Sequence, residues 1–319
     1  MRQFTLKQLR YFVVAGELGS TTQAARKLHV SQPLISAAIQ HIETVTGIHL
    51  FVRHHAQGLS LTPSGHQLMV RARQLLREAE GVEKYALSLG DEIGGELYLV
   101  AFGSFASVFL PQLLRSYADR HPSVSLYCDE HSQADIIAGL QQGDYELAFT
   151  YDLNVPEELD FTPLYRFPPY AVVSSDHPLS TRESISLAEL VTYPMVLLDW
   201  PLSREYFLAI FTQNGLVPTV AHRARSMDML RGLVRNGFGF SLFNTPLSAL
   251  EPEGDGRLRA LKIKDHARAL LLGIACIRAL RLSPAAEALF ELALNTESWS
   301  SAFPEFDFGV GRKVPPKTV

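Results

Sequence analysis

The sequence predicts a chain that begins with a small all-helical domain, continues through one long helix, and ends in a two-lobed α/β domain. Three observations support this fold class. Residues 20–53 read as two short helices joined by a tight turn. From residue 68 to 89, apolar residues recur at alternating spacings of four and three, which is typical of a long helix with a heptad seam. Beyond residue 95, short apolar strands alternate with helices, a pattern that indicates an α/β domain. The expected divisions are 1–61, 62–90, 91–297 and a tail, 298–319, in which no regular element is expected.

Residues 4–18 are expected to form a first helix, packed beneath the helix pair. Ser20 is placed to cap the next helix, with Gln23 three residues later completing a capping box. Ser31 is placed to cap the helix after the turn, and Pro33 falls in its first turn, where a missing N–H costs little. Gly47 is expected to end this helix.

The helix after Ser31 has two different sides when its residues are placed at about 100° per step. The apolar side carries Leu34, Ile35, Ala38, Ile39, Ile42 and Val45. The opposite side carries Gln32, Pro33, Ser36, Ala37, Gln40 and His41. A compact polar face that follows a tight turn fits the major groove of DNA. The same pattern also fits an ordinary helical hairpin in a protein core, and the residues alone leave both interpretations open.

Two short extended pieces between His49 and Leu61 resemble the wing of a winged helix-turn-helix domain. In a wing, Arg53 and His54 would reach a phosphate or the minor groove. His54 and His55 also suggest a metal site, but neighbouring residues of an extended chain point apart and no third ligand is evident. We therefore expect a wing and no bound metal.

The charge is divided unevenly along the chain, although the net charge is only −4. Residues 1–90 hold 10 Lys and Arg against 5 Asp and Glu, a balance of +5. The remaining residues hold 19 against 28, a balance of −9. This asymmetry places the charge that attracts phosphate with the helix pair, although a chance fluctuation would give the same numbers.

The long helix is expected to begin at Thr62, as cap, and Pro63, as first residue. The residues expected at its seam are Leu68, Ala72, Leu75, Ala79, Val82 and Ala86. Such a seam predicts a dimer, which would present two DNA-reading domains to a two-fold operator. The alternative is an amphipathic helix that packs only within its own chain.

The α/β domain is expected to have two lobes, because the strand pattern restarts after Pro163, Pro168 and Pro169. Lobe one would hold about 91–162 and 268–297, and lobe two about 163–267, with a hinge at Asp91–Gly95. Helices are expected to begin just after strands at Gly103–Ser104, Glu130–Ser132 and Asp199–Ser203, and a further helix at Ser226. The N–H groups of these helix ends attract carboxylates, so a small organic anion is expected between the lobes. Each serine can equally be a plain helix cap, and Phe105, Trp200, Tyr151 and Tyr206 can be either ligand walls or core.

Across most of the chain the sequence resembles the LysR-type transcriptional regulators. The resemblance rests on Leu9, Phe12, Ala24, Ala25, Leu28, Val30, Ser31, Gln32, Pro33, Ser36, Ile39, Glu43, Gly47, Leu50, Phe51, Arg53, Leu61, Thr62, Pro63 and Gly65. It implies a winged helix-turn-helix domain, a linker helix and a co-inducer domain that resembles type 2 periplasmic binding proteins. The chain departs from many members at Ala37 and Ala38, where a long polar residue is common, so more specificity is expected from DNA shape.

The resemblance also implies site residues and partners. The residues expected to contact DNA are Ser31, Gln32, Pro33, Ser36, Ala37, Gln40, Arg53 and His54. By position, the resemblance places Ser104, His131, Ser132, Tyr151, Pro201, Ser203 and Asn244 at the effector site. Phe105 and Trp200 are added as candidate apolar walls, and Ser226 as a further helix start. The expected partners are double-stranded operator DNA, a small-molecule effector and RNA polymerase, with a homodimer assembling into a homotetramer.

Other classes of protein fit less well. No apolar run of about 18 residues and no secretory signal are present, so we expect a cytoplasmic protein without a membrane span. Cys128 and Cys276 lie in apolar runs and are expected to be buried, reduced thiols. A nucleophile elbow, a phosphate loop and paired metal ligands are missing, so neither enzymatic activity nor a cofactor is expected. The remaining alternatives are an architectural DNA-binding protein without an effector and a solute-binding protein.

Overall fold

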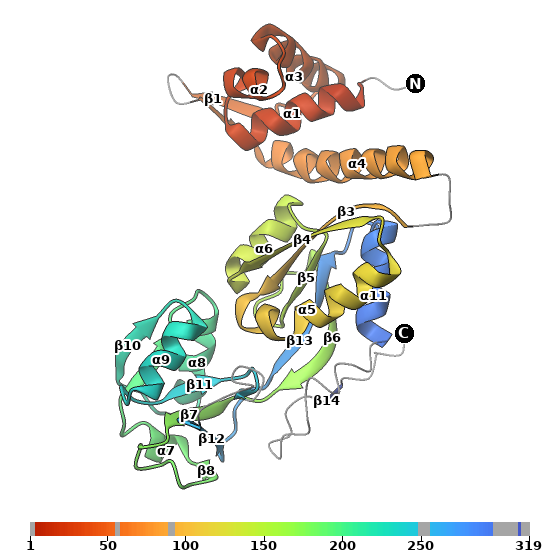
Figure 1. The fold of residues 1–319 in the computed structure, drawn as a ribbon. Coiled ribbons are helices and arrows are strands. Elements are labelled where there is room, and N and C mark those ends of the chain that lie inside the picture. Colours follow the sequence, from red (N-terminus) through yellow and green to blue (C-terminus); the bar gives the residue numbers. More distant parts are fainter. Residues whose placement is uncertain (1–3, 55–57, 89–92, 248–255, 296–311, 314–319) are drawn as a thin grey trace.

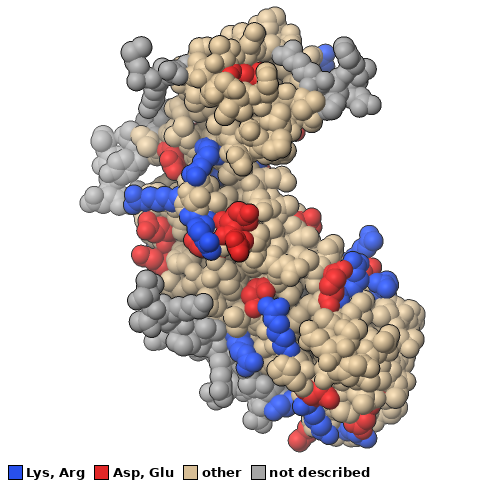
Figure 2. Space-filling view, turned by 180° about the vertical axis from the view of Figure 1, so that it is seen from behind, with Lys and Arg blue, Asp and Glu red and all other residues tan. Residues whose placement is uncertain are grey.

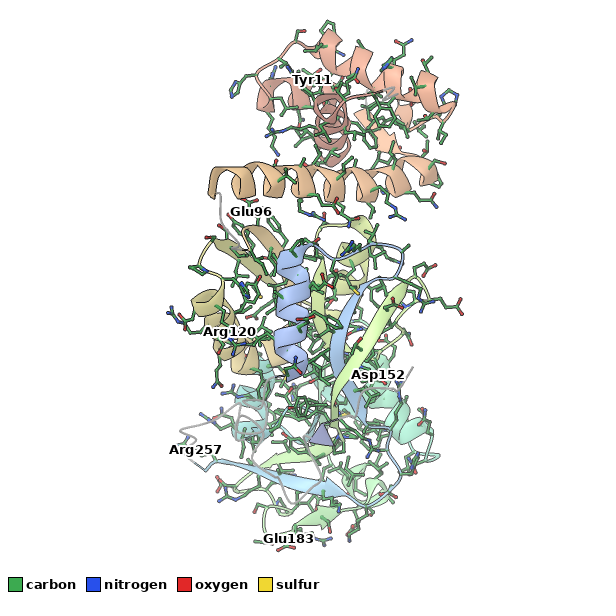
Figure 3. The ribbon with its side chains drawn as sticks, turned by 90° about the vertical axis from the view of Figure 1, so that its right-hand side faces the viewer. Tyr11, Glu96, Arg120, Asp152, Glu183 and Arg257 are labelled. Atoms are coloured by element: carbon green, nitrogen blue, oxygen red, sulfur yellow. The ribbon has the colours of Figure 1, made fainter. Side chains whose placement is uncertain are left out.

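The computed structural model describes residues 4–54, 58–88, 93–247, 256–295 and 312–313. Four parts follow one another along the chain: an amino-terminal domain, a linker helix, lobe one and lobe two (Figure 1). The linker helix runs between the amino-terminal domain and lobe one, and lobe two hangs from the opposite end of lobe one. Figure 3 shows the same order from the side, with Glu96 beneath the linker helix and Asp152 near the junction of the lobes.

The amino-terminal domain is a three-helix unit with a two-stranded wing. Its elements are α1 (Leu6–Leu18), α2 (Thr21–Lys27), α3 (Gln32–Thr46), β1 (Phe51–His54) and β2 (Gly58–Leu61), with β1 and β2 antiparallel. Phe12, Ile35 and Ile42 are fully buried where α1 packs against α3. The predicted winged helix-turn-helix fold is confirmed.

Most helix ends follow the local sequence signals, but two details of α3 differ from the prediction. The Ser20 hydroxyl accepts a hydrogen bond from the Gln23 N–H (3.3 Å), and α3 ends at Gly47 with a left-handed φ of 69°. The prediction that the Ser31 side chain caps α3 is wrong, because Ser31 lies at the cap position without a side-chain capping bond. Leu34 was assigned to the apolar side, yet it is 44% exposed, because Pro33 and Leu34 lie in the first turn, ahead of the contact with α1.

Glu43 joins α3 to the wing. Its Oε1 accepts hydrogen bonds from the backbone N–H groups of Leu50 (2.7 Å) and Phe51 (3.4 Å). The predicted cap of the next helix is confirmed, since the Gly65 N–H donates to the Thr62 hydroxyl at 2.9 Å. Glu43 therefore ties α3 to the start of the wing, and Thr62 caps the helix that follows the wing.

The linker helix α4 (Pro63–Ser88) packs against its own chain along part of the expected seam. Ala72 is 2% exposed and, with Met69, belongs to the core of the amino-terminal domain, with Leu68 packed against it. The assignment of Ala72 to an intermolecular seam is therefore wrong. Only tertiary packing decides which stripe of an amphipathic helix stays free, and here the first turns are used by the domain itself.

A second face of α4 rests on lobe one. Gln74 Nε2 donates to the Arg281 carbonyl (2.7 Å), and Arg77 donates to the Gly143 carbonyl (2.9 Å). Burial lowers the pKa of Arg77, while the nearby carboxylate of Glu146 favours its charged form. These contacts attach the amino-terminal domain and the linker helix to lobe one.

Lobe one is built on a six-stranded mixed sheet of order β14-β6-β13-β5-β3-β4. Its strands are β3 (Gly95–Phe102), β4 (Val124–His131), β5 (Leu147–Tyr151), β6 (Leu159–Phe167), β13 (Leu270–Ile277) and β14 (Arg312–Lys313). Its helices are α5 (Gly103–Arg120), α6 (Gln133–Gln142) and α11 (Pro284–Asn295). Strand β3 is parallel to β4 and β5, whereas β13 is antiparallel to β5 and β6.

The crossing to lobe two lies later in the chain than expected. Pro163 lies within β6, opposite Gly273 of β13, at a bulge where the register shifts. A proline is tolerated there because a bulge interrupts the ladder of hydrogen bonds. A Cβ at Gly273 would lie 2.3 Å from the Thr162 carbonyl oxygen, so this close approach requires glycine. The chain crosses only after β6 ends at Phe167, at Pro168 and Pro169.

Lobe two contains a four-stranded sheet, β11-β7-β12-β8, and a parallel pair, β10-β9, joined by a bridge between Met195 and Phe240. Its strands are β7 (Tyr170–Ser174), β8 (Ser184–Ile185), β9 (Met195–Leu198), β10 (Val220–Ala224), β11 (Ser241–Phe243) and β12 (Leu258–Ile263). Its helices are α7 (Leu187–Leu190), α8 (Ser203–Thr212) and α9 (Met227–Arg235). The predicted two-lobed α/β architecture is confirmed.

Two smaller expectations need correction. Within the tail, Arg312 and Lys313 pair with β6 as strand β14, an element that the composition did not predict. Cys128 and Cys276 are free, but Cys128 is exposed and Cys276 only partly buried. Cys128 lies on β4, an edge strand with a single neighbour, so the burial predicted from its apolar surroundings is wrong.

Candidate DNA-reading surface and interlobe cavity

The outer face of α3 carries the residues that the sequence assigned to DNA. The side chains of Gln32, Pro33, Ala37 and Gln40 are exposed. Ser36 lies on the same face and is partly buried. Ser31, just before the helix, is also exposed. These side chains therefore share one accessible surface, along the first half of a helix whose other face is anchored in the core.

A broad groove lies beside this surface, between α2, α3 and the wing. Its described lining combines hydroxyl and amide side chains with apolar residues, glycines, one glutamate and one histidine: Ser20, Thr21, Thr22, Gln32, Ser36, Ile39, Gln40, Glu43, Thr44, Gly47, Ile48, His49, Phe51, Gly58 and Leu59. None of these lining residues is a lysine or an arginine. The groove thus offers neutral hydrogen-bonding groups rather than a dense positive charge.

Gln32 is the centre of a small hydrogen-bond network in the groove. Its amide nitrogen donates to the hydroxyl of Thr21 on α2 (3.2 Å) and to that of Ser36 one helical turn later (2.9 Å). Thr21 was not predicted at the site from the sequence. A signal was present, however, because Thr21 is the first residue of the helix that precedes the turn.

Arg53 and His54 belong to β1, paired with Leu59 and Gly58 of β2. Their side chains, like all of His55, lie outside the described residues. Among the described residues, no group of three or more His, Cys, Asp and Glu side chains is arranged to hold a metal ion.

The part of the predicted seam that faces solvent is short. Leu75 is 44% and Val82 66% exposed, seven residues apart on α4. Ala79 is partly buried, and the side chain of Ala86 lies outside the described residues. Large apolar side chains exposed at heptad spacing are typical of a helix that packs on a partner.

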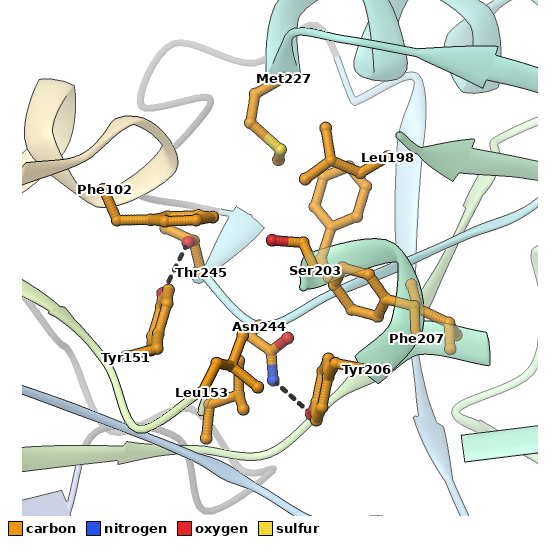
Figure 4. A pocket seen from close by; sticks show the side chains of 13 residues that line it. Phe102, Tyr151, Leu153, Leu198, Ser203, Tyr206, Phe207, Met227, Asn244 and Thr245 are labelled. Carbon is orange, nitrogen blue, oxygen red and sulfur yellow. Dashed lines mark hydrogen bonds between the residues drawn. The ribbon is translucent and has the colours of Figure 1, made fainter. Parts of the chain in front are cut away.

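An enclosed cavity of about 20 Å³ lies where the two lobes meet (Figure 4). Its lining is mostly aromatic and aliphatic: Phe102, Tyr151, Leu153, Leu198, Ser203, Tyr206, Phe207, Met227, Leu242, Phe243, Asn244, Thr245 and Leu270. A space of this size holds about one water molecule. The closed arrangement therefore leaves a site, but no room for a metabolite.

Two polar atoms on the wall of this cavity lack a protein partner. Ser203 is 3% and Asn244 5% exposed, and within the described part of the chain neither Ser203 Oγ nor Asn244 Oδ1 is hydrogen bonded. A buried polar atom without a partner costs about 1–3 kcal/mol. Both atoms belong to residues that the sequence placed at the effector site, and in Figure 4 both side chains lie at the cavity.

The other polar groups around the cavity are paired. Asn244 Nδ2 donates to the Phe167 carbonyl (2.9 Å) and to the Tyr206 hydroxyl (3.1 Å). The Tyr206 hydroxyl donates to the Arg268 carbonyl (2.7 Å), and burial raises the pKa of Tyr206 well above its ordinary value. Tyr151 and Thr245 are joined through their hydroxyls (3.3 Å). The orientation of the Asn244 amide is thus fixed, with its oxygen left for a ligand.

Three helices begin at the cavity wall. Phe102 immediately precedes α5, Ser203 is the first residue of α8, and Met227 is the first residue of α9. Leu202, just before α8, has a φ of 68°, which few non-glycine residues adopt. The helix ends bring partial positive charge to a site whose described lining contains no charged side chain. Arg204 is directed instead to Asp199 (2.7 Å) and Glu205 (2.7 Å).

Several residues predicted at the effector site are not among those that line the cavity. His131 is exposed and bonded to the Tyr145 hydroxyl (3.1 Å), and Ser132 caps α6. Trp200 stacks edge-on against Phe102 (5.3 Å) and donates to the Arg225 carbonyl, so it forms a second layer. Pro201 is exposed and Ser226 caps α9. The side chains of Ser104 and Phe105 lie outside the described residues, although the backbone of both is in α5.

Most of the apolar lining was missed from the sequence. Leu198, Leu242 and Leu270 lie in continuous apolar strands, whose residues look alike whether they face a core or a cavity. These three leucines can be assigned to the cavity only when the strands of both lobes are seen together in the folded structure. Leu153 and Thr245 follow shortly after β5 and β11, and this position at a strand end was the available signal.

Basic and acidic side chains are interspersed over the surface. On the face in Figure 2, both signs lie side by side over the effector lobes, and the amino-terminal domain shows few charges. No helix in the described part of the chain combines the length and apolar character that crossing a membrane requires.

Two family profiles match the chain. The profile described as "Bacterial regulatory helix-turn-helix protein, lysR family" matches residues 6–66, and "LysR substrate binding domain" matches residues 90–297. The transcriptional regulator CysB of Haemophilus influenzae is 29% identical over 240 residues, 74% of each chain. The crystal structure of HinK, a LysR family regulator from Pseudomonas aeruginosa, is 32% identical, covering 91% of this chain and 97% of that one, with a TM-score of 0.58. A full-length OxyR variant from Pseudomonas aeruginosa, 22% identical and covering 93% and 97%, shares the fold with a TM-score of 0.71.

Proposed function

Because the chain belongs to the LysR family of DNA-binding transcriptional regulators, we propose that it controls transcription in response to a small organic anion bound between its lobes. The observation that carries this proposal is the pair of unpartnered polar atoms, Ser203 Oγ and Asn244 Oδ1, in a cavity between the lobes. A ligand with matching hydrogen-bonding groups would remove the cost of both. Members of this family are regulators and not enzymes.

The anionic character of the ligand is supported by the three helix starts at Phe102, Ser203 and Met227. Free N–H groups at helix amino ends stabilise a carboxylate or phosphate. The aromatic walls, Phe102, Tyr151 and Phe207, suit an apolar or aromatic body. Because Asn244 Oδ1 is a neutral acceptor, we also expect the ligand to carry a hydroxyl or N–H group that donates a hydrogen bond to it.

Ligand entry requires the lobes to move. Sites for small molecules usually occupy about 300–1,000 Å³, far above the 20 Å³ found here. The lobes are joined by two crossings, after Phe167 and before Leu270, which allow rotation without unfolding either sheet. Opening, binding and reclosure would change how lobe one and α4 present the two DNA-reading domains.

We further propose that the protein acts in the cytoplasm as a homodimer that pairs into a homotetramer and adjusts access of RNA polymerase. Exposed Leu75 and Val82 on α4 support the first contact, since two copies packed along this helix would bury both side chains. The predicted DNA contacts remain Ser31, Gln32, Pro33, Ser36, Ala37, Gln40, Arg53 and His54.

Selection of binding sites from random DNA with the full-length protein tests the DNA-reading part. We expect a sequence with two related half-sites, separated by about one or two helical turns. A thermal-shift screen of organic acids, neutral sugars and cations then tests the ligand. If only sugars or cations stabilise the protein, the proposal of an anionic ligand is contradicted. If acids bind but do not alter the DNA footprint, an architectural role in DNA binding is favoured.

A further inference from the structure

We propose that Thr21 and Ser36 orient the side-chain amide of Gln32 so that it reads one DNA base as a hydrogen-bond acceptor. The inference rests on the proposed DNA-reading face and adds a chemical rule to it. The base that Gln32 contacts would carry an exocyclic amino group, so it would be adenine or cytosine. Thr21, on a different helix, would be a positioning residue for that contact.

The geometry brings three residues from two helices together. Gln32 is the first residue of α3, Ser36 follows one turn later on the same face, and Thr21 is the first residue of α2. Gln32 Nε2 lies 3.2 Å from Thr21 Oγ1 and 2.9 Å from Ser36 Oγ. The tight turn between the helices makes this meeting possible.

The hydrogens on the Gln32 amide show whether its side chain can still donate a hydrogen bond to DNA or can only accept one. A glutamine amide nitrogen carries two hydrogens, and two protein oxygens receive them here. Among the described hydrogen bonds, none is donated to Gln32 Oε1, which keeps both lone pairs for DNA. In the major groove the donors are the N6 amino group of adenine and the N4 amino group of cytosine.

This arrangement differs from the contact that a free glutamine makes. A free side chain bonds adenine through two atoms, donating to N7 and accepting from N6. With both N–H groups of Gln32 engaged by Thr21 and Ser36, only the accepting half remains. The two hydroxyls each accept from Gln32 and keep an O–H to donate, so an acceptor is flanked by two donors.

The position of the network favours a base over a phosphate. Thr21, Gln32, Ser36 and Gln40 line the same groove, and Gln32 and Ser36 lie in the first two turns of α3. In helix-turn-helix proteins this end of the second helix contacts base edges, while the first helix crosses the backbone. The described lining holds no lysine or arginine, the usual partners of phosphate.

The first experiment locates the base pair that Gln32 reads. Sites are selected from random DNA with full-length wild type, Gln32→Ala, Thr21→Val and Ser36→Ala. We expect Gln32→Ala to relax preference at one pair of each half-site, and Thr21→Val and Ser36→Ala to alter preference at that same pair. Thr22→Val is the matched control, because Thr22 lines the groove but has no described bond to Gln32. Ser36→Ala keeps the test decisive if Thr21→Val folds poorly.

The second experiment determines polarity with base analogues at that pair. Removing the amino group, with purine in place of adenine or 2-pyrimidinone in place of cytosine, should weaken wild-type binding roughly 10- to 100-fold. The same analogue should lower the DNA affinity of the Gln32→Ala protein only slightly further, because that protein has already lost the contact. A 7-deaza purine, which lacks only the N7 acceptor, should weaken wild type less than removal of the amino group does, and should weaken Thr21→Val more than it weakens wild type.

Three outcomes would overturn the inference. In the first, the wild-type protein loses affinity for DNA with the 7-deaza base and keeps its affinity with the base that lacks the amino group, which would make Gln32 a donor. A second is an equal effect of Thr21→Val and Thr22→Val at the Gln32 pair. A third is weakening of all sequences alike by Thr21→Val, which would make Thr21 a phosphate contact. If wild type enriches no sequence at all, the DNA-reading function fails as well, and this result differs from the other three.

Discussion

Arg73 of the linker helix forms an ion pair with Asp144, the second residue after α6 in lobe one. The same guanidinium donates to the Gln142 carbonyl (2.8 Å) and lies 3.3 Å from Glu17 of α1. One side chain therefore touches the amino-terminal domain and lobe one from the helix between them. It also meets the carboxyl end of α6, where a cation is favoured by the helix dipole.

The Arg73–Asp144 pair should hold the linker helix on lobe one. Asp144→Asn removes the charge while keeping the shape, and we expect a loss of about 1 kcal/mol in the free energy of unfolding, since Arg73 is mostly buried. Hydrogen exchange along residues 70–78 should accelerate. Asp119→Asn is the control, because its pair with Arg115 is exposed and should contribute within about 0.5 kcal/mol. Equal protection in both variants would show that the pair does not dock the helix.

Leu75→Asp should separate the dimer. In a helix-to-helix contact the new carboxylate would be buried without a partner, so sedimentation should show monomers and operator affinity should collapse. For sedimentation, Leu34→Asp is a matched control, because Leu34 has the same residue type and the same 44% exposure but lies on α3. If Leu75→Asp remains dimeric, the interface lies elsewhere.

Ser203→Ala should separate stability from ligand binding. The change removes a buried hydroxyl without a partner, so the ligand-free protein should be as stable as wild type or more stable by up to about 1 kcal/mol. Binding of an acid identified by the thermal-shift screen should weaken by about 1–3 kcal/mol through loss of a hydrogen bond to a charged group. Operator affinity without ligand should not change. A destabilised Ser203→Ala protein would mean that the hydroxyl has a structural role.

The two cysteines should be slow to react at neutral pH. Desolvation of the thiol, with the carboxylates of Glu130 and Asp129 nearby, raises the pKa of Cys128 to about 11. Desolvation with Asp160 nearby raises the pKa of Cys276 to about 11. The thiolate is the reactive form, so alkylation by iodoacetamide should rise about tenfold per pH unit from about pH 7 to 10.

An internal disulfide is also unexpected. Strands β3 and β5 separate β4 from β13, which puts the two Cα atoms roughly 14 Å apart by strand spacing. Disulfides need less than about 7 Å. A disulfide formed rapidly under mild peroxide would contradict this expectation and indicate a thiol switch.

The elements that the sequence predicted well are those with a local signal. Ser20, Gly47 and Thr62 act through bonds or backbone angles within a few residues, so their helix ends could be read along the chain. Strand β9 also carries a local signal, because a short, continuous apolar run such as Met195–Leu198 is typical of a buried strand. Pro163 misled the prediction, because a bulge that tolerates proline depends on the partner strand and leaves no local trace.

For the candidate sites the same division holds. The polar face of α3 and the serines at helix starts could be read from the sequence, since each depends on spacing within one element. The family could be recognised from an ordered set of residues between Leu9 and Gly65. The folded structure shows that the domain core uses Ala72 while Leu75 stays exposed, and that Thr21 reaches Gln32. It also shows that Ser203 and Asn244 share a cavity, whereas His131 and Ser132 do not line it. The physical reason is that burial and partnership depend on which surfaces meet, and residues far apart in the chain meet only when both lobes and the linker helix have packed.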